Sequence, residues 1–428
     1  MKRIFLVIIA GFTSLLSFSQ DIDKIINAAE VERIEKVLSA DDMQGRKTFT
    51  LGIDKAADFI ADEFSKTKLK TFSNDKGWFQ EFSMIKTRPL QSTLLLDHDS
   101  VPAANYYVNT TEAMIDHSSM EGLEIVRVTK DDDFFKTVQP LLESNKNLLV
   151  LIDTAHAAKF KRIKNFGNRA RFSSPYHQVL VLTPTTAPNY FELHVKNECT
   201  EQKLKNVVGI LPGKSRKNEF VVFSGHYDHL GIGKPNANQD SIYNGANDDA
   251  AGTTAVIMLA KYFSEQKERN ERSIIFVAFT AEEIGGYGSR YFSKQLDPDK
   301  VVAMFNIEMI GTESKWGTNS AYITGYERSD MGKILQANLT GSKFHFEPDP
   351  YPQQNLFYRS DNATLAELGV PAHTISTSKM DNEPNYHKVT DEISTLDMNN
   401  MAEIMKAIAI SSSTIISGKE TPSRVEKK

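Results

Sequence analysis

The chain has 428 residues, of which 40% are hydrophobic and 25% are charged. This is the composition of an ordinary globular protein, and the length is sufficient for more than one structural unit. The formal net charge of −5 excludes the strongly basic surface of a typical nucleic-acid-binding protein. The single cysteine excludes an intramolecular disulfide and a thiolate zinc site, and Cys199 is predicted to be a buried small hydrophobe.

The first residues have the pattern of a secretory signal peptide. Lys2 and Arg3 precede an apolar run from 4 to 16, and small residues stand at −3 and −1 of a cut after Ser19. The run is too short for a typical bilayer span, and a short membrane anchor is the alternative interpretation. Residues 1–19 are therefore predicted to direct export to the periplasm or the medium, with no membrane span left after cleavage.

The segment from Asp21 to about Phe72 is predicted to be helical. Apolar side chains recur at three- and four-residue spacing over 25–38 and 56–64. The phrase from Ser39 to Arg46 lies between these two stretches, and its cap residues and glycine predict a loop.

Residues 78–203 have a different character. Short apolar or alternating runs are separated by turn-rich spacers, which predicts a β-rich inserted subdomain. The basic stretch 159–171 is interpreted as a solvated face. Five histidines lack partners at ligand spacing and are predicted to be surface or hydrogen-bonded residues. These are His98, His117, His156, His177 and His194.

From residue 204 onward, predicted strands and helices alternate, which predicts an α/β fold with a mostly parallel mixed sheet flanked by helices on both faces. Residues 20–77 and 204–416 are predicted to form this domain, and the polar segment 417–428 is predicted to be disordered. The strands are expected near 220–224, 273–280, 302–308, 320–324 and 371–376, and the helices near 250–264, 329–338, 362–368 and 394–416.

Polar phrases follow two of the buried strands. The run 220–223 leads into Ser-Gly-His226-Tyr-Asp228, and the run 273–279 leads into Thr-Ala-Glu282-Glu283. Open α/β sheets build their sites at the carboxyl ends of their strands, so these side chains are expected to meet at one edge. A His, an Asp and a Glu at one sheet edge predict a hydrolytic metal centre.

Further candidates complete a set of nitrogen and oxygen ligands. Asp248 stands just before a predicted helix, where a carboxylate is well placed to bridge two ions. Glu308 closes an apolar strand, a costly position unless the carboxylate is paired or ligated. His387 follows a loop and supplies the fifth of the roughly five ligands that two bridged ions need. Imidazole and carboxylate together favour zinc, although manganese or cobalt is also accepted by such a set.

Two roles are predicted from position. Asp228 lies two residues after His226 and is expected to orient the other ring nitrogen of that histidine. Glu282 and Glu283 diverge at their strand end, so one can bind metal while the other acts as general base. Position alone leaves open which glutamate has which role.

With these residues in place, the chain resembles the M28 family of co-catalytic di-zinc peptidases, which are mainly aminopeptidases. The matching phrases are GHYDHLG, NGANDDAAGT, FTAEEIGGYGS, FNIEMIG and NYHKVTDE. The resemblance is good over about 30–75 and 204–415 and weak over about 78–203. It implies the zinc-exopeptidase (phosphorylase/hydrolase-like) fold and two zinc ions (Zn²⁺) per chain.

The resemblance also assigns roles. It implies that His226, Asp248 and Glu308 bind one ion, and that Asp248 bridges to a second ion held by Glu283 and His387. The family usually has Asp where Glu308 stands, so this carboxylate is one methylene longer.

The two catalytic roles are carried over in the same way. The resemblance implies that Glu282 is the general base. It also implies that the hydroxyl of Tyr386 steadies the oxyanion of the reaction, although a structural tyrosine beside a ligand is the alternative.

The predicted function is that of an exported zinc aminopeptidase acting on peptides. A glutaminyl-cyclase-like aminoacyltransferase with one zinc and a non-catalytic relative without metal are the alternatives, which metal content separates. A carboxypeptidase or dipeptidase would need a cation for the substrate carboxylate. Arg359 is the candidate for that cation, with a structural role as the competing interpretation.

Overall fold

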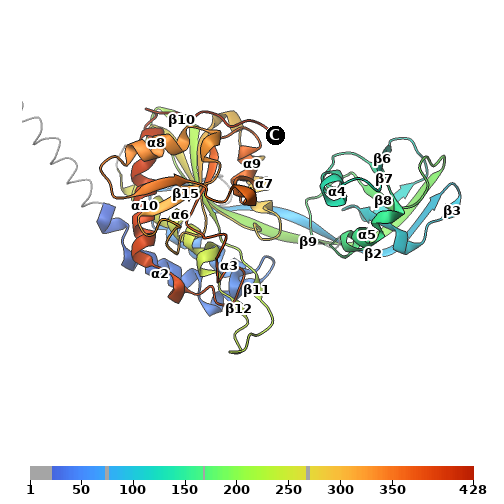
Figure 1. The fold of residues 1–428 in the computed structure, drawn as a ribbon, viewed down its shortest axis with the longest axis horizontal. Helices are drawn as coiled ribbons and strands as arrows, with labels where there is room; N and C mark the ends of the chain where they lie inside the picture. The colour runs from blue at the N-terminus through green and yellow to red at the C-terminus, as the bar shows by residue number, and fades with distance from the viewer. Residues whose placement is uncertain (1–21, 73–76, 167–168, 267–269) are drawn as a thin grey trace, which may run out of the picture. The chain divides into compact units, whose positions relative to one another are not determined.

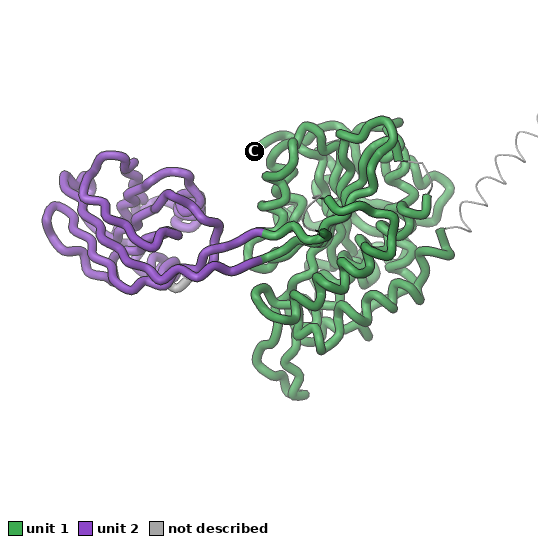
Figure 2. The backbone as a smooth tube through the Cα atoms, turned by 180° about the vertical axis from the view of Figure 1, so that it is seen from behind, with its two compact units in different colours: residues 1–81, 204–428 green, residues 82–203 purple. Residues whose placement is uncertain are grey.

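The computed structural model describes residues 22–72, 77–166, 169–266 and 270–428. The predicted signal peptide, residues 1–19, lies outside these ranges. The chain forms two compact units, unit 1 (residues 1–81 and 204–428) and unit 2 (residues 82–203), as Figure 2 shows. Within the described ranges, no helix has the length and apolar character needed to cross a membrane.

Unit 1 is built on a mixed sheet whose four central strands are parallel (Figure 1). The strand at each side of this parallel group runs antiparallel to it, and the edge strand is parallel to its own neighbour. The predicted mostly parallel, mixed α/β sheet is therefore confirmed. In spatial order the strands are β16 (His345–Pro348), β15 (Ser320–Ile323), β17 (Ala372–Ser376), β14 (Val301–Ile307), β10 (Arg216–His226), β13 (Arg272–Phe279) and β9 (Phe191–Leu211).

The central strands are buried on both faces because their inner segments are apolar. In β10, Val221 and Phe223 belong to one apolar core, whereas Val222 belongs to the core on the opposite face. This alternation is the normal result of side chains pointing to opposite faces of a strand. The larger core packs against α2 (Ala28–Leu38), α3 (Leu51–Ser65), α6 (Ala251–Glu265) and α10 (Met398–Ser411), and the smaller core against α7 (Tyr287–Ser293) and α9 (Ala363–Ala366).

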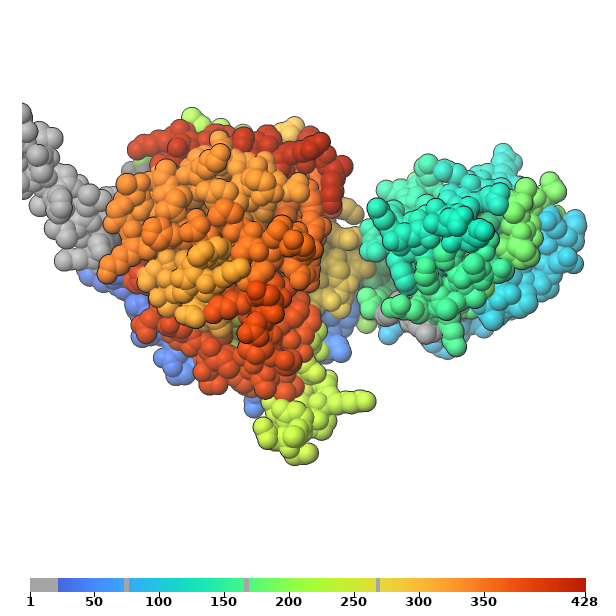
Figure 3. Space-filling model, viewed as in Figure 1, coloured from blue at the N-terminus to red at the C-terminus, as the bar shows by residue number. Residues whose placement is uncertain are grey.

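Smaller elements complete unit 1. The segment predicted as a loop after α2 is the 3-10 helix η1 (Asp41–Arg46), in which Gly45 has a positive φ. The strand β11 (Gly231–Ile232) pairs with β12 (Ile242–Tyr243), and the segment 233–241 between them stands out from the body of the unit in Figure 3. Two further α-helices among the described residues are α8 (Met331–Asn338) and α11 (Ser413–Ile416).

The C-terminal segment is ordered, so the prediction of disorder for 417–428 is wrong. Val425 is buried against the smaller core, and Arg424 Nη1 donates to the carbonyl of Val301 at 2.7 Å. The guanidinium of Arg272 donates to the carbonyl of Glu420 at 2.7 Å. A polar composition predicts disorder on average, but one buried apolar side chain and these hydrogen bonds anchor the segment.

Unit 2 has its own sheet and apolar cores. Its strands lie in the order β4 (Tyr106–Asn109), β8 (Gln178–Leu182), β7 (Leu148–Ile152) and β6 (Glu124–Val128), of which the last three are parallel. Two helices, α4 (Phe134–Leu142) and α5 (Ala157–Phe166), accompany this sheet. The long strands β2 (Phe79–Leu96) and β9 carry the chain into and out of the unit, and the short strands β3 (Asp99–Ser100) and β5 (Met114–His117) pair with them.

Cys199 is exposed, so the prediction that it is buried is wrong. It lies on β9 beyond the alternating buried positions, where a small apolar side chain has no core to enter. The histidines of unit 2 are exposed or have partners, as predicted. His117 Nδ1 lies 3.1 Å from His177 Nε2, His156 Nε2 lies 2.8 Å from the Thr129 carbonyl, and the His98 ring stacks on Tyr190.

Candidate metal centre

Three neighbouring strands of unit 1 deliver the polar side chains of the candidate site. β10 ends at His226, β13 ends three residues before Glu282, and β14 ends immediately before Glu308. The spatial order β14-β10-β13 places these ends side by side. Because the three strands are parallel, their carboxyl ends lie at the same edge of the sheet, as expected for an α/β site.

Asp248 lies at the centre of the cluster, with its two carboxylate oxygens facing two different histidines. Its Oδ1 lies 3.3 Å from His226 Nε2, and its Oδ2 lies 3.2 Å from His387 Nε2. His387 Nε2 also lies 3.3 Å from Glu283 Oε2. A ligand atom of Glu308 lies within 4.8 Å of ligand atoms of both His226 and Asp248. Two groups that could hold an ion therefore share Asp248, namely His226, Asp248 and Glu308, and His229, Asp248 and Glu283. His387, the fifth predicted ligand, reaches the second group through its contacts with Asp248 and Glu283.

The donors fit zinc. In a tetrahedral site with bonds of about 2.0–2.1 Å, neighbouring donor atoms lie roughly 3.3 Å apart. The separations of 3.2–3.3 Å around Asp248 match this spacing. Three of the donor atoms, His226 Nε2, Asp248 Oδ2 and Glu308 Oε2, are buried without a hydrogen-bond partner. Buried polar atoms without partners are costly, and an ion at each group would satisfy them.

Two further aspartates hold the loop that carries Asp248. Asp391 accepts hydrogen bonds from the backbone N–H groups of Asn247 at 2.8 Å and Asp248 at 3.0 Å. Asp249 accepts from the backbone N–H groups of His226 at 3.0 Å and Met309 at 3.1 Å. The carboxylate of Asp249 thus ties the ends of β10 and β14 to the Asp248 loop.

Asp228 differs in detail from its predicted role. His226 Nδ1 lies 3.1 Å from the backbone carbonyl of Asp228, whereas the carboxylate is 3.8 Å away. That carboxylate instead accepts from the backbone N–H groups of Glu282 at 3.0 Å and Glu283 at 3.2 Å. The residue serves both strand ends because the turn after β10 directs its side chain across to the end of β13.

Electrostatics divide the carboxylates into two kinds. Burial alone would raise the pKa of Asp248, but contacts with His226 and His387 hold that pKa well below its usual range. Burial raises the pKa of Glu282 well above its usual range, and the Glu308 carboxylate raises it further. Asp248 thus has the charge-stabilised environment of a ligand, and Glu282 has that of a group that gains a proton readily.

Tyr386 lies at the margin of the cluster. Its ring stacks on that of His387, with centroids 3.9 Å apart. Burial raises the pKa of its hydroxyl above the usual value, so the group remains a hydrogen-bond donor at neutral pH. Tyr386 and Glu308 both line one pocket.

The walls of that pocket are mixed. Met309, Leu356 and Met380 contribute apolar surface, and Tyr322 adds an aromatic ring. Arg359 is the one cation among its lining residues, and its Nη1 lies 3.4 Å from Gln354 Oε1. Arg359 thus reaches the site pocket and is not enclosed in the core.

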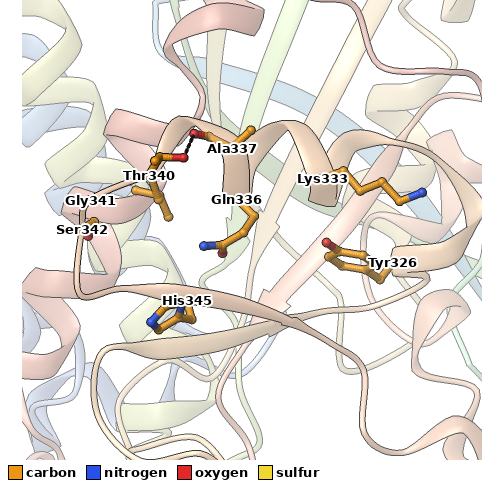
Figure 4. A pocket seen from close by; sticks show the side chains of 9 residues that line it. Tyr326, Lys333, Gln336, Ala337, Thr340, Gly341, Ser342 and His345 are labelled. Atoms are coloured by element: carbon orange, nitrogen blue, oxygen red, sulfur yellow. Dashed lines mark hydrogen bonds between the residues drawn. The ribbon is translucent and has the colours of Figure 1, made fainter.

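A second depression lies between α8 and β16 (Figure 4). It is lined by Tyr326, Lys333, Gln336 and His345, with none of the predicted site residues among its lining. Gln336 Oε1 accepts from the backbone N–H of Phe346 at 2.7 Å, so its amide oxygen is already engaged. The depression supplies no cluster of metal-ligating groups, and the chemistry is concentrated at the Asp248 cluster.

His229 belongs to the cluster but was not among the predicted residues. Its ring is fully buried, and Nδ1 lies 2.8 Å from Glu283 Oε1 and 3.9 Å from Asp248 Oδ2. The phrase GHYDHLG contains this second histidine, and its position three residues after His226 was the only signal for it. Sequence spacing could not show that the turn after β10 points both rings at one centre.

Arg46 is a second residue whose position only the fold reveals. Its guanidinium is fully buried and donates to the backbone carbonyls of Leu38 and Asn244 at 2.6 Å and of Tyr227 and Gly245 at 2.8 Å. These hydrogen bonds join the end of α2 to the segment that follows β10 and to the segment that precedes Asp248. Arg46 is the last residue of the segment from Ser39 to Arg46, and through this side chain the segment holds the loops of the candidate site together.

Comparison with known proteins agrees with this fold. The model of Peptidase family M28 matches residues 206–411, and the chain is similar to this family over that range. The aminopeptidase YwaD of Bacillus subtilis (strain 168) is 22% identical over 236 residues, which are 53% of this chain and 48% of YwaD. A probable zinc metalloprotease of Pyricularia oryzae is 34% identical over 109 residues, 26% of this chain and 21% of that protein. The chain thus spans at most about half the length of these relatives.

Solved structures share the fold at low sequence identity. The aminopeptidase from Aneurinibacillus sp. strain AM-1 superposes with a TM-score of 0.54 at 16% identity, over 95% of this chain and 96% of that one. The glutaminyl cyclase of Porphyromonas gingivalis superposes with a TM-score of 0.50 at 11% identity, over 92% of this chain and 99% of that one. The fold is therefore compatible with both activities, and the site must distinguish them.

Proposed function

We propose that this chain is an exported aminopeptidase with two zinc ions that hydrolyses N-terminal residues from peptides. The observation that carries the proposal is the pair of donor groups around Asp248, one completed by His226 and Glu308 and the other by Glu283 and His387. Zinc fits these donors, and similar proteins are named aminopeptidase and zinc metalloprotease. Bound zinc would supply Lewis acidity and a water of lowered pKa.

Residues of the chain would transfer the proton, stabilise the oxyanion and bind the substrate. Glu282 carries a carboxylate that does not belong to either donor group, and we assign it the role of general base. It takes a proton from the attacking water at a carboxylate oxygen and passes it to the leaving amine. Tyr386 donates its hydroxyl hydrogen to the developing oxyanion. The pocket beside Glu308 receives the first side chain of the substrate.

Charge supports the direction of cleavage. Acidic groups dominate the centre, and Glu308 is among the residues that line the adjoining pocket. A positively charged α-amine is therefore favoured over a free carboxylate by Coulomb attraction. Arg359 is the lining residue of the pocket that favours the carboxypeptidase or dipeptidase alternative.

Export is the second part of the proposal. It is supported by Lys2 and Arg3, the apolar run 4–16 and the small residues before the cut after Ser19. Mass spectrometry of protein from the native host should find a mature chain that begins at or near Gln20. An intact Met1 on soluble cytoplasmic protein would contradict export without affecting the enzymatic assignment.

The experiment that tests the function combines metal analysis with a substrate panel. Purified protein should contain two zinc ions per chain, lose activity to a chelator and regain it with zinc. It should cleave aminoacyl chromogenic amides and leave N-blocked amides intact. One zinc per chain with cyclisation of N-terminal glutamine would instead establish the glutaminyl cyclase alternative, and cleavage of blocked peptides from the carboxyl end would establish a carboxypeptidase.

A further inference from the structure

The second histidine of the turn after β10 is held rigidly. The backbone N–H of His229 donates to the carbonyl of Arg46 at 3.2 Å. Gly245 has a positive φ of 56° and packs directly on the ring, since a Cβ there would lie 2.5 Å from His229 Cδ2. With the ring fully buried, these contacts leave His229 one orientation, with Nδ1 toward Glu283.

The contact between His229 and Glu283 differs in length from those between the ligands. His229 Nδ1 lies 2.8 Å from Glu283 Oε1, whereas Glu283 Oε2 lies 3.3 Å from His387 Nε2. Donors that share a tetrahedral zinc ion lie roughly 3.3 Å apart. A charge-assisted N–H···O contact is shorter, at about 2.7–2.9 Å. The shorter separation is that of a donor–acceptor pair, and the longer one is that of two ligands of one ion.

The two oxygens of Glu283 consequently face different partners. Oε1 faces His229, and Oε2 faces His387 and the second donor group. Neither His229 Nδ1 nor Glu283 Oε1 has a hydrogen-bond partner among the described groups, so the 2.8 Å separation is a close approach of two unpartnered polar atoms. A carboxylate held at one oxygen is limited to presenting the other, which restricts it to a single bond with an ion.

We propose that His229 is a positioning residue for the second metal group: its ring N–H at Nδ1 binds Glu283 Oε1 and holds Glu283 so that Oε2 alone faces the ion. The inference rests on the proposed function, because it requires that both donor groups bind zinc. His229 then affects the binding of only one ion, the one held by Glu283 and His387. The ion held by His226 and Glu308 is not affected.

The test uses two substitutions of His229 in the full chain. His229→Asn keeps a donor, since Nδ2 of Asn occupies the place of the ring Nδ1, whereas His229→Leu removes it. We expect His229→Leu to weaken the binding of one of the two zinc ions roughly 10–100-fold, the range typical for loss of such partners, and to leave the other unchanged. His229→Asn should retain most of the wild-type affinity. Competition with a chromogenic chelator measures both dissociation constants without an activity assay.

A matched control separates positioning from general destabilisation. His373 is a buried histidine of β17 whose ring nitrogens contact the carbonyl of Thr324 at 2.8 Å and the hydroxyl of Ser329 at 2.7 Å. His373→Leu should leave both zinc affinities unchanged. Equal weakening of both ions in His229→Leu and His373→Leu would overturn the proposal, and so would wild-type affinities in His229→Leu.

A measurement on the wild-type chain keeps the proposal testable if His229→Leu does not fold. With ¹⁵N-labelled histidine and ¹¹³Cd²⁺ in place of zinc, ring nitrogens of His226 and His387 should show coupling to cadmium. Those of His229 should show none, with a proton on Nδ1. Coupling at His229 would overturn the proposal and make His229 a ligand. Fewer than two ions bound by the wild-type chain would instead contradict the proposed function itself.

Discussion

The candidate metal cluster of unit 1 and the polar clusters of unit 2 are made of the same residue types, but their polar atoms are paired in opposite ways. In unit 2, the ring nitrogens of His194 lie 2.5 Å from Asp116 and 2.7 Å from Glu192, and the groups are largely exposed. In unit 1, His226 is buried, and its Nε2 has no hydrogen-bond partner. Histidine next to acid is therefore not the distinguishing feature of a metal site.

The difference lies in what holds the acids. Asp228, Asp249 and Asp391 of unit 1 accept backbone N–H groups from the loops that carry the ligands. Burial raises the pKa of these three carboxylates, the backbone N–H groups oppose that effect, and the hydrogen bonds hold the ligand-bearing loops in place. The exposed acids of unit 2 are balanced by water and by neighbouring side chains, which requires no ion. Burial together with unpaired donor atoms, and not residue type, marks the site.

Removal of the central carboxylate of unit 1 should have the largest effect on metal binding. Asp248→Ala should lose both zinc ions and reduce peptidase activity to background, because Asp248 is common to the two donor groups. Plasma mass spectrometry of the purified variant measures the metal. Asp116→Ala in unit 2 also removes an acid beside a histidine, and it should keep full metal content and activity. Two ions retained after the Asp248 change would refute its bridging role.

A change in the Glu282–Glu283 pair separates the base from the ligand. Glu282→Gln should keep two zinc ions and lower kcat by roughly 10²–10⁴-fold, the usual contribution of general acid–base catalysis. Glu283→Gln should lower zinc content and activity together. Metal analysis and steady-state kinetics of the two variants decide. If Glu282→Gln sheds zinc while Glu283→Gln keeps both ions and is inactive, the two assignments are reversed.

The buried Arg46 can be compared with the exposed Arg88. Arg46→Ala leaves four backbone carbonyls without their charged donor, and we expect unit 1 to lose about 3–5 kcal/mol of unfolding free energy. Arg88 of unit 2, whose side chain is 68% exposed, pairs with Glu198. Arg88→Ala should change the unfolding free energy by less than about 1 kcal/mol. Denaturant titration followed by circular dichroism compares the two, and equal effects would contradict the clamp.

Zinc binding should depend on pH through His387. Asp248 and Glu283 raise the pKa of His387 to about 10 in the metal-free chain, so its ring is protonated at neutral pH. An ion must displace that proton. Its affinity should therefore fall about tenfold for each pH unit below that pKa, in addition to protons lost from other ligands. Calorimetry in buffers of different ionisation enthalpy measures the protons released, and binding without proton release would contradict this account.

Much of the fold and the site was accessible from the sequence. The continuous apolar runs that become β10, β13 and β14 predicted strands buried on both faces, and the order of elements predicted a mostly parallel sheet. The polar phrases after these runs named His226, Glu283 and Glu308 because strand ends on one edge must meet. Family resemblance then separated Glu282 from Glu283, which strand position alone left undecided.

Tertiary structure decided what the side chains do once they meet. The turn after β10 packs against Gly245 and Arg46, and this packing sets its direction. That direction decides whether the Asp228 carboxylate faces His226 or the end of β13. It also decides whether His229 joins the cluster. The order of the C-terminal segment likewise depends on where Val425 finds a core. Local sequence determines which segments are strands and which groups are polar, because these follow from periodicity and short-range sterics. The partners of a buried polar atom are determined by residues far away in the chain, because only the folded packing brings them within hydrogen-bond distance.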